Sequence, residues 1–416
     1  MIIEPDEGEF SLHPRNFPEL VIGPSLISRT VDAIRDAPGL RYYLIERIEE
    51  NALDASALLD LSQILIARGE RDYGLHIQKQ AISLRRDFRI VHGNGTGLRI
   101  LAFVAKGDAA ANIPIDFLLH GSNCILWLCY VDARTQDLRD VPPHDVAMVA
   151  IADVAANMPV LTRLKGLLGS WKTPILNNCF SVPPRNGRRH AFCTSPEIVL
   201  AQTVQLTRSE LLSVANEQMD LSKIVLNLTF PVIVKPIGDE RQQLGRQMGN
   251  PRELLRFLVT ELNDEFDVSP FVDFRGADGL YAKYSVMFVG GKPFPLEMVL
   301  WDDSLIQFAV EASNQTIDIR LREAGWAGTF HRNFAIRHAD AFAALNGSLN
   351  LDYFGIDCAE LPDGRLLVFR IGNAVSVHDM DSAARPASRS LCARNIFAAF
   401  LAMAADRAST GAEYSG

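Results

Sequence analysis

A β-hairpin pattern near the C-terminus constrains this chain more than any other feature. Residues 351–373 read LDYFGIDCAELPDGRLLVFRIGN, which is two apolar runs joined by a Pro-Asp-Gly turn. Apolar, β-branched and aromatic runs bounded by turn residues predict strands, and Asp-Gly between two such runs predicts a hairpin. Asp357 lies on the first strand, and Arg370 and Asn373 lie at the end of the second. The pattern therefore predicts a sheet whose last hairpin presents polar side chains.

Length and composition indicate a globular protein of several units. A chain of 416 residues is long enough for roughly two to four packed units. Apolar residues make up 48% and charged residues 22% of the chain, an ordinary balance. No apolar run reaches the ~18 residues of a membrane span, and residues 125–131 have the length of a buried strand. The net charge of −9 argues against a nucleic-acid partner, since phosphate binding needs a basic surface.

The N-terminal sequence and the cysteines predict a cytoplasmic protein. The first ten residues, MIIEPDEGEF, are acidic and lack the basic and apolar regions of a secretion signal. The six cysteines form no CxxC pair, and most lie in apolar stretches. This pattern favours reduced core thiols over disulfides or a zinc site. The one basic segment, PPRNGRRH at 183–190, is either a solvated loop or a loop that faces an anion.

Residues 1–97 predict an irregular leader followed by helices. Asp54 and Ser56 are candidate N-caps, and apolar residues recur at helical spacing on both sides of a break at Gly69. This predicts one helix–turn–helix of tetratricopeptide type. One pair cannot bury both of its faces, so we expect it to dock on the next domain. A surface for a protein partner or a second copy of the chain is the alternative, whereas one repeat is too little for a tetratricopeptide adaptor.

Residues 98–180 predict a small parallel α/β domain. Strand patterns at 98–108, 124–132 and 145–153 alternate with helical material, and 174–178 reads as an edge strand. Such alternation predicts a parallel sheet. No GxGxxG follows the first strand, so dinucleotide binding gains no support.

Residues 181–416 predict a larger domain with antiparallel sheets. Gly290-Gly291 predicts a hairpin turn between two strands. Helices are expected over 195–212, from Asn250, over 332–349 and over 390–408. The last of them is apolar on several sides and is expected to pack across a sheet.

A lysine ends the buried strand pattern FPVIVKP at residues 230–236. Burying an unpaired charge is strongly unfavourable, so Lys235 must face solvent or an anion. Taken alone, the pattern favours an exposed lysine at a strand end. The hairpin that follows downstream favours a phosphate-binding lysine.

The order of these elements resembles the ATP-grasp superfamily over roughly residues 98–400. The resemblance rests on the Lys235 strand, on SPFVDFRGADGLYAKYSVMFVGGKPFP at 269–295, and on the 351–373 hairpin. The chain is most similar to the group with N-terminal helical repeats and a ligase domain like those of glutathione synthetase and RimK-type enzymes. This implies an α/β (α+β) fold in three parts: a leader and tetratricopeptide-like helices in 1–97, a small α/β domain in 98–180, and an ATP-grasp domain with antiparallel sheets in 181–416.

The same resemblance implies an ADP-forming carboxylate–amine ligase that acts through an acyl-phosphate. ATP and Mg²⁺ would be its cofactors, and a small-molecule or peptide carboxylate and an amine its substrates. The implied roles are phosphate binding by Lys235 and Gly238, adenine and ribose contacts by Ser269 and Asp273, stabilisation of the transferred phosphoryl group by Lys283, and magnesium binding by Asp357 and Asn373. Arg370 would lie in the same catalytic site.

Three positions depart from the family pattern. The loop over 236–250 is poor in glycine, Ser285 replaces an arginine, and Arg370 replaces a magnesium-binding glutamate. A serine cannot supply a bidentate positive fork, and an arginine opposes a dication. Arg370 either neutralises phosphate charge directly or fills the site by pairing with Asp357. Glu360 is disfavoured as a replacement ligand because strand alternation puts it on the other face.

Two hypotheses therefore stay open. The first is a working ligase, and the second is a catalytically inactive ATP-grasp paralogue that binds or scaffolds a partner or a small ligand. Two polar segments, His378-Asp379 and Trp301-Asp302-Asp303, are candidates for a substrate pocket. Local hydrogen bonds or turns are the more common explanation of such segments.

Overall fold

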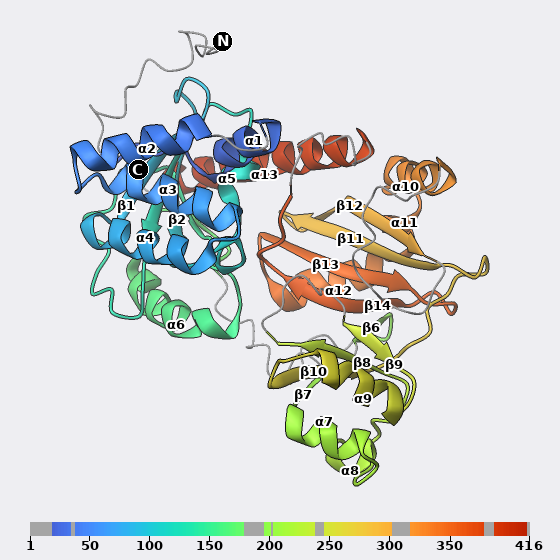
Figure 1. The fold of residues 1–416 in the computed structure, drawn as a ribbon. Helices are drawn as coiled ribbons and strands as arrows, with labels where there is room; N and C mark the ends of the chain where they lie inside the picture. The colour runs from blue at the N-terminus through green and yellow to red at the C-terminus, as the bar shows by residue number, and fades with distance from the viewer. Residues whose placement is uncertain are drawn as a thin grey trace.

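The computed structural model describes residues 19–34, 38–178, 195–200, 203–237, 245–301, 317–377 and 387–413. These residues form a mixed α/β fold with three sheets, two of five strands and one of four. The first sheet and the N-terminal helices lie on one side in Figure 1, the other five-stranded sheet lies beside them, and the four-stranded sheet lies below it. The expected fold class, a small parallel sheet followed by antiparallel sheets, is confirmed. No helix in these ranges is long and apolar enough to cross a membrane.

The predicted helix pair is present and packs on the first sheet. The helices before this sheet are α1 (Pro24–Ile34), α2 (Pro38–Glu50), α3 (Ala55–Ala67) and α4 (Arg71–Leu84). Asp54 caps α3 by accepting a hydrogen bond from the backbone nitrogen of Ala57. Gln78 on α4 exchanges two hydrogen bonds, of 2.9 and 2.8 Å, with the backbone of Gly107 beyond the second strand. The pair is therefore docked on the unit that follows it.

The first sheet has the strand order β1-β3-β2-β4-β5. Its strands are β1 (Asp87–Val91), β2 (Arg99–Val104), β3 (Ile125–Tyr130), β4 (Val146–Val149) and β5 (Ile175–Leu176). Strands β2 to β5 run parallel, as expected, and β1 adds an antiparallel edge although it precedes residue 98. The short helices α5 (Ile115–Leu118) and α6 (Met158–Leu167) connect the strands, with 3-10 turns at 109–111, 155–157 and 168–170.

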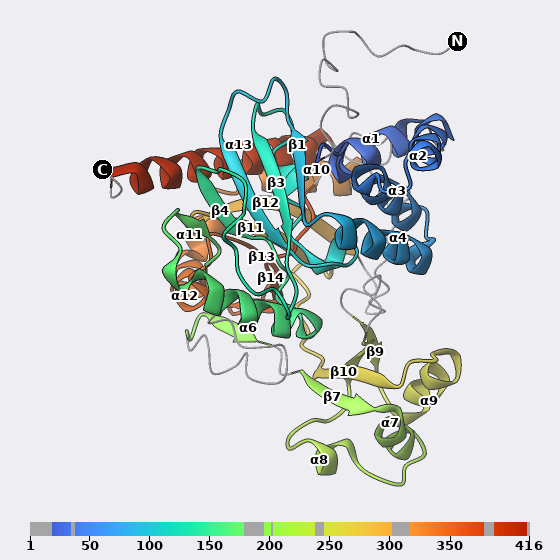
Figure 2. The same cartoon turned by 90° about the vertical axis from the view of Figure 1, so that its left-hand side faces the viewer.

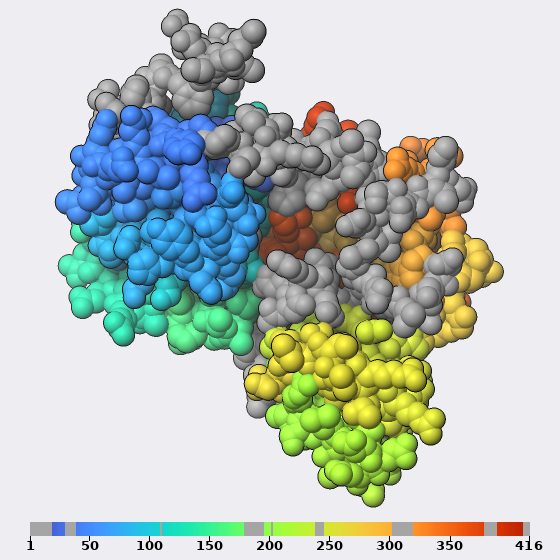
Figure 3. All heavy atoms as spheres, viewed as in Figure 1, coloured from blue at the N-terminus to red at the C-terminus, as the bar shows by residue number. Residues whose placement is uncertain are grey.

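A smaller lobe, formed by the described residues between 203 and 270, carries the second sheet. Its strand order is β7-β10-β8-β9, with β7 (Val204–Thr207), β8 (Val232–Pro236), β9 (Arg246–Met248) and β10 (Glu265–Pro270). Helices α7 (Arg208–Ala215), α8 (Leu221–Ile224) and α9 (Pro251–Thr260) belong to it. Figure 3 shows this lobe, in green and yellow, projecting from the rest of the molecule.

The prediction of a helix over 195–212 is wrong for the first part of this segment. Strand β6 (Ile198–Leu200) and strand β7 occupy this segment before α7 begins. The β-branched residues here favour strands, and the capping box of Thr207 and Glu210 fixes the start of α7 at Arg208.

The third sheet has the strand order β12-β11-β13-β14-β6. It is built from β11 (Tyr281–Val289) and β12 (Lys292–Trp301), joined by the predicted glycine turn, and from β13 (Tyr353–Glu360) and β14 (Leu366–Gly372). Gly290 and Gly291 have φ angles of 56° and 75°, which glycine adopts without strain. Helices α10 (Ile317–Thr329), α11 (Phe334–Arg337) and α12 (Ala339–Leu349) cover one face, so the helix expected over 332–349 is present as two.

The long helix α13 (Ala387–Glu413) joins the first and third sheets, as Figures 1 and 2 show. One hydrophobic core includes Leu58 of α3, Leu126 of β3, Met287 of β11 and Phe400 of α13. The last helix therefore packs across a sheet, as expected. The described cysteines, Cys124, Cys129, Cys358 and Cys392, are buried free thiols. The proposed boundaries after residues 97 and 180 stay predictions.

Candidate functional site

Three adjacent strands of the third sheet bring four polar side chains together. Ser285 on β11 is paired with Asp357 on β13, and Asp357 is paired with Arg370 on β14. Lys283 lies two residues before Ser285, so it is on the same face of β11. We call Lys283, Ser285, Asp357 and Arg370 the Asp357 cluster. It occupies the face that looks toward α13 and the first sheet, because Met287 on the same alternation belongs to that shared core.

The two carboxylate oxygens of Asp357 face different partners. Oδ1 accepts a 2.6 Å hydrogen bond from the Ser285 hydroxyl and lies 3.9 Å from Lys283 Nζ. Oδ2 lies 3.9 Å from Arg370 Nη1. Both distances to the cations exceed the ~2.7–3.2 Å of a hydrogen bond. Arg370 thus forms an ion pair with Asp357, in line with the hypothesis that these two residues pair, but the pair is loose.

Arg370 differs from its neighbours in exposure and in hydrogen bonding. The side chains of Lys283 and Asp357 are 6% and 11% exposed, whereas that of Arg370 is 28% exposed. The Nε atom of Arg370 is nevertheless buried and has no hydrogen-bond partner among the described residues. Leaving a buried donor unsatisfied costs about 1–3 kcal/mol. Within the described residues this buried donor is therefore unsatisfied, whereas another part of the side chain is exposed to solvent.

The cluster does not fit Mg²⁺. Magnesium is held by one or two carboxylates together with phosphate oxygens and water. Here one carboxylate stands against two cations, and each pair of unit charges at 4 Å is worth about 4 kcal/mol at an effective dielectric constant of 20. The charges of Lys283 and Arg370 therefore oppose a dication beside Asp357. The described ranges also contain no group of three or more His, Cys, Asp or Glu side chains that could hold a metal ion.

Asn373, predicted to bind magnesium, connects the third sheet to the first. Its Oδ1 accepts a 2.9 Å hydrogen bond from the backbone nitrogen of Asp153, and its Nδ2 donates one of 2.9 Å to the carbonyl of Ile151. Asn177, just after β5, makes the reciprocal contact, donating 2.9 Å to the carbonyl of Tyr353 and accepting 2.8 Å from its nitrogen. We call this pair of contacts the asparagine seam. A metal ion at Asn373 would have to compete with it.

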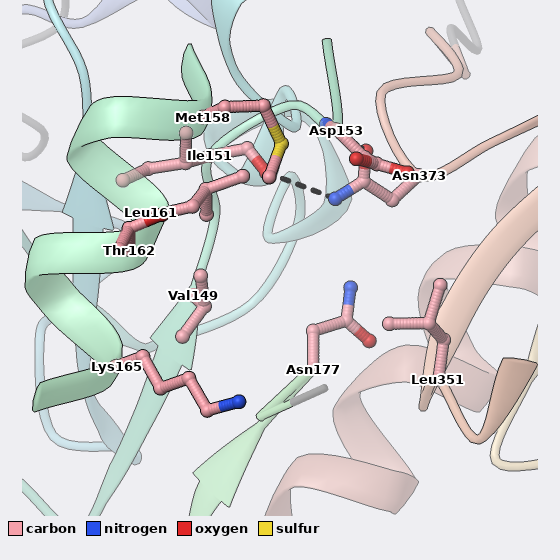
Figure 4. A pocket seen from close by; sticks show the side chains of 10 residues that line it. All are labelled: Val149, Ile151, Asp153, Met158, Leu161, Thr162, Lys165, Asn177, Leu351 and Asn373. Atoms are coloured by element: carbon pink, nitrogen blue, oxygen red, sulfur yellow. Dashed lines mark hydrogen bonds between the residues drawn. The ribbon is translucent and has the colours of Figure 1, made fainter. Parts of the chain in front are cut away.

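A cavity of ≈ 200 Å³ lies along the asparagine seam, at the carboxyl ends of β4 and β5. In Figure 4, Asn373 and Asp153 lie at one end of the cavity and Lys165 of α6 lies at the other. Apolar side chains line the space between them, namely Val149, Ile151, Met158, Leu161 and Leu351. Lys165 is exposed and makes no ion pair with another described residue. The volume is below the ~300–1,000 Å³ of drug-sized ligand pockets, so the space suits a small molecule.

The other predicted nucleotide contacts lie on the smaller lobe and on the segment after it. Lys235 is half-buried on β8, paired with Asp267 of β10, and Ser269 is paired with Ile233. Asp273 is bound by Arg275, whose hydrogen bond lowers the pKa of that carboxyl below its ordinary value. The roles of Lys235, Ser269 and Asp273 in nucleotide binding stay predictions.

Several candidates from the sequence lie outside the described residues. These are Gly238 with the loop over 238–244, Asp302-Asp303 and His378-Asp379. Trp301 is described, and its ring stacks on Tyr281 with centroids 5.7 Å apart. Together with Phe274 it forms a small aromatic cluster where the segment from the smaller lobe enters β11.

Sequence reasoning missed the asparagine seam and Lys165. Two consecutive asparagines, Asn177-Asn178, follow the predicted edge strand, and asparagine tolerates positive φ. The φ of Asn177 is 53°, so this dipeptide was the available signal for a special position. Lys165 carried no signal, since one lysine on an exposed helix is ordinary.

No protein-family model and no curated protein matches the chain. Two solved structures are similar to it over most of its length. One is the RimK domain protein ATP-grasp from Sphaerobacter thermophilus DSM 20745, 14% identical, with 73% of this chain and 97% of that chain covered and a TM-score of 0.36. The other is the D-alanine-D-alanine ligase from Coxiella burnetii, 11% identical, with 76% and 98% covered and a TM-score of 0.38. Since both TM-scores are below 0.5, the function is inferred below from the chain's own residues.

Proposed function

We propose that the chain is an ATP-grasp-type protein that binds ATP between the smaller lobe and the third sheet. We further propose that it joins a carboxylate to an amine with release of ADP. The observation that supports this best is the meeting of Lys283, Asp357 and Arg370 on adjacent strands. These are the positions at which the sequence resemblance implies phosphoryl chemistry, and the lobe that carries Lys235 precedes them in the expected order.

Charge stabilisation is the main task of such a site. Phosphoryl transfer is catalysed chiefly by positioning and by neutralising the phosphate oxygens. In the proposed reaction the carboxylate oxygen attacks the γ-phosphorus, and the bond to the β-phosphate oxygen breaks to release ADP. The amine then attacks the acyl carbon, and inorganic phosphate leaves. Lys235 holds the phosphates of ATP, while Lys283 and Arg370 face the transferred group.

The cavity along the asparagine seam supports a small substrate with an anionic group. Lys165 offers the charge, and the apolar walls suit a short hydrocarbon body. Asn373 lies at the opposite end of the cavity and three residues after Arg370, so a bound molecule would extend toward the Asp357 cluster. Lys165→Gln is expected to weaken substrate binding and to leave ATP binding unchanged, with the exposed Lys172→Gln as its control.

The proposal is tested by titrating the protein with ATP calorimetrically, in EDTA and in Mg²⁺, followed by an assay for ADP. Binding in the micromolar to millimolar range is expected. Lys235→Gln should weaken it about tenfold, equal to 1.4 kcal/mol, whereas Lys223→Gln on exposed α8 of the same lobe should not. No heat at several millimolar ATP in either condition would contradict the proposal.

A second candidate is a catalytically inactive paralogue that binds a partner or a small ligand. The hydrogen bond from Ser285 to Asp357 favours it, because serine and Arg370 stand where a ligase would have an arginine and a metal-binding glutamate. ATP binding without ADP release, in the presence of mixed amino acids and small carboxylates, would select this candidate. A homodimer or a protein partner at the N-terminal helices and a cytoplasmic location stay predictions.

A further inference from the structure

We propose that the cavity along the asparagine seam binds an ω-amino acid, that is, a short hydrocarbon chain with a carboxylate at one end and an amine at the other. This rests on the proposed function and names the amine substrate of the ligation. The support comes from the two ends of the cavity, from its walls and from its place in the fold.

One end of the cavity is basic. Lys165 on α6 is the one cation among the ten residues that line the cavity. Its side chain is exposed, and its ammonium points toward Asn177 in Figure 4. A ligand can therefore reach this group without any change in the packing. A single ammonium matches the single charge of a carboxylate better than the charge of about −1.5 to −2 on a phosphate group.

The opposite end offers oxygen atoms and no cation among the lining residues. Asp153 and Asn373 lie there, and the half-buried Asp153 is the one carboxylate in the lining. Carboxylate and amide oxygens accept hydrogen bonds from an amine, whereas a carboxylate repels a second carboxylate. The two ends therefore differ in sign, which favours an amino acid over a dicarboxylate.

The walls between the two ends are apolar. Val149, Met158, Leu161 and Leu351 line this part of the cavity and suit methylene groups. Each methylene that is buried there should raise the affinity about fourfold. The volume of ≈ 200 Å³ limits the chain to a short one. An α-amino acid carries both charged groups on one carbon, so it cannot place one at each end.

The place of the cavity sets the direction of the bound molecule. Asn373 follows Arg370 by three residues, whereas Lys165 belongs to a helix of the first sheet. The amine therefore faces the proposed reaction site, and the carboxylate at Lys165 stays unreacted. In the ligation, a bond forms from the amine nitrogen to the acyl carbon while the bond from that carbon to the phosphate oxygen breaks. The protons that the nitrogen loses pass to solvent.

A series of small probes tests the ends and the length. We would measure binding to the full chain by saturation-transfer NMR, with and without ATP, for glycine, β-alanine, γ-aminobutyrate and ε-aminocaproate. The affinity should rise about fourfold for each added methylene and fall once the chain is longer than the cavity. Butyrate, butylamine and glutarate each lack one of the two groups, and they should bind at least about tenfold more weakly than γ-aminobutyrate.

A charge reversal at Lys165 locates the carboxylate. Lys165→Glu should weaken the binding of γ-aminobutyrate at least about tenfold and strengthen the binding of putrescine, which has an amine at each end. Lys172→Glu is the matched control, because Lys172 is also exposed, follows the same helix and does not line the cavity. It should bind like the parent chain. Both variants should melt like the parent and bind ATP normally.

The outcomes separate this inference from the proposed function. Normal ATP binding without binding of any probe would overturn the inference alone. Binding of γ-aminobutyrate without ATP binding would overturn its role as the ligation substrate together with the proposed function. Butyrate or glutarate binding as tightly as γ-aminobutyrate would show that the amine is not recognised, and glycine binding as tightly would show that the walls add nothing. A Lys165→Glu chain with the parent's affinity would place the carboxylate elsewhere.

Discussion

Asp60 and Asp357 are both buried carboxylates, but the chain surrounds them in opposite ways. Asp60 on α3 accepts hydrogen bonds of 2.8 and 3.2 Å from the backbone nitrogens of Ile22 and Gly23. Burial outweighs these bonds and raises the pKa of Asp60 to about 7. Asp357 instead accepts one hydrogen bond, from the Ser285 hydroxyl, and lies 3.9 Å from each of two cations, Lys283 and Arg370.

The difference separates a contact that holds the fold from one that can accept a ligand. Asp60 holds the segment just before α1 against α3, because both of its carboxylate oxygens accept hydrogen bonds from the backbone of Ile22 and Gly23. The asparagine seam is of the same kind, since each amide uses both its oxygen and its nitrogen. The Asp357 cluster instead has two loose ion pairs and, among the described residues, an unsatisfied donor on Arg370. Changes at the first kind of contact should alter stability, and changes at the second should alter binding.

The largest effect is expected from the titration of Asp60. Its pKa in the folded chain, about 7, lies above the ordinary 3.8, so the folded chain holds the proton more tightly than the unfolded one. The free energy of unfolding should therefore fall as pH rises from about 4 to about 7 and then level off. At ~1.4 kcal/mol per pKa unit, the loss is on the order of 4 kcal/mol. Urea unfolding across this range measures it, and Asp60→Asn should flatten the curve.

Glu360 provides a control of opposite sign. Burial raises the pKa of Glu360, but His338 and Arg337 beside it prevail and lower it to about 2. The contribution of Glu360 to the free energy of unfolding is fully present above about pH 4.5 and is lost only as pH falls toward 2. Glu360→Gln should therefore leave the slope between pH 5 and 7 unchanged. An Asp60→Asn chain with the parent's slope would contradict the explanation.

The next effect concerns the asparagine seam. Asn177→Ala removes both partners from the buried backbone of Tyr353 and leaves alanine at a φ of 53°. A loss of about 2–4 kcal/mol in the free energy of unfolding is expected. Asn227→Ala is the control, because Asn227 has a φ of 65° but is exposed, and its loss should be at most about 1 kcal/mol. Equal losses would mean that the seam adds nothing beyond backbone conformation.

A smaller loss of stability, with a gain of binding, is expected for Asp357→Asn. The change removes the negative charge that faces Lys283 and Arg370, at a cost of about 1–3 kcal/mol in the free energy of unfolding, because Arg370 is partly exposed. The net charge of the cluster rises by one, so ATP should bind more tightly in EDTA. Weaker ATP binding in EDTA would contradict this expectation, and weaker binding only in Mg²⁺ would indicate that Asp357 contacts the ligand through a metal ion.

The smallest change in stability is expected for Arg370→Gln. The ion pair is 3.9 Å long and partly exposed, and the change removes an unsatisfied donor. The free energy of unfolding should stay within about 1 kcal/mol of the parent value. A loss as large as that of Asp357→Asn would show that Arg370 belongs with Asp60 among the contacts that hold the fold.

Local signals in the sequence determined a large part of this fold. The Pro-Asp-Gly turn, the Gly290-Gly291 turn and the apolar runs beside them predicted both hairpins of the third sheet. Helical spacing with the Asp54 cap predicted the α3–α4 pair. The sequence also indicated that Asp357 and Arg370 would meet, because paired strands of a hairpin bring such residues face to face.

Tertiary structure decided what these local signals could not. Residues 198–200 form a strand because β14 is there to pair with them, and no pattern in 195–212 shows that partner. The side chain of Asn373 accepts a hydrogen bond from the backbone of Asp153, 220 positions away in sequence, and its role in metal binding stays a prediction. Side-chain types show which groups need partners, but the packing of the first and third sheets around α13 decides which groups meet. The same packing explains why Arg370 Nε is unsatisfied, because it brings no acceptor from the described residues within hydrogen-bonding distance of this atom.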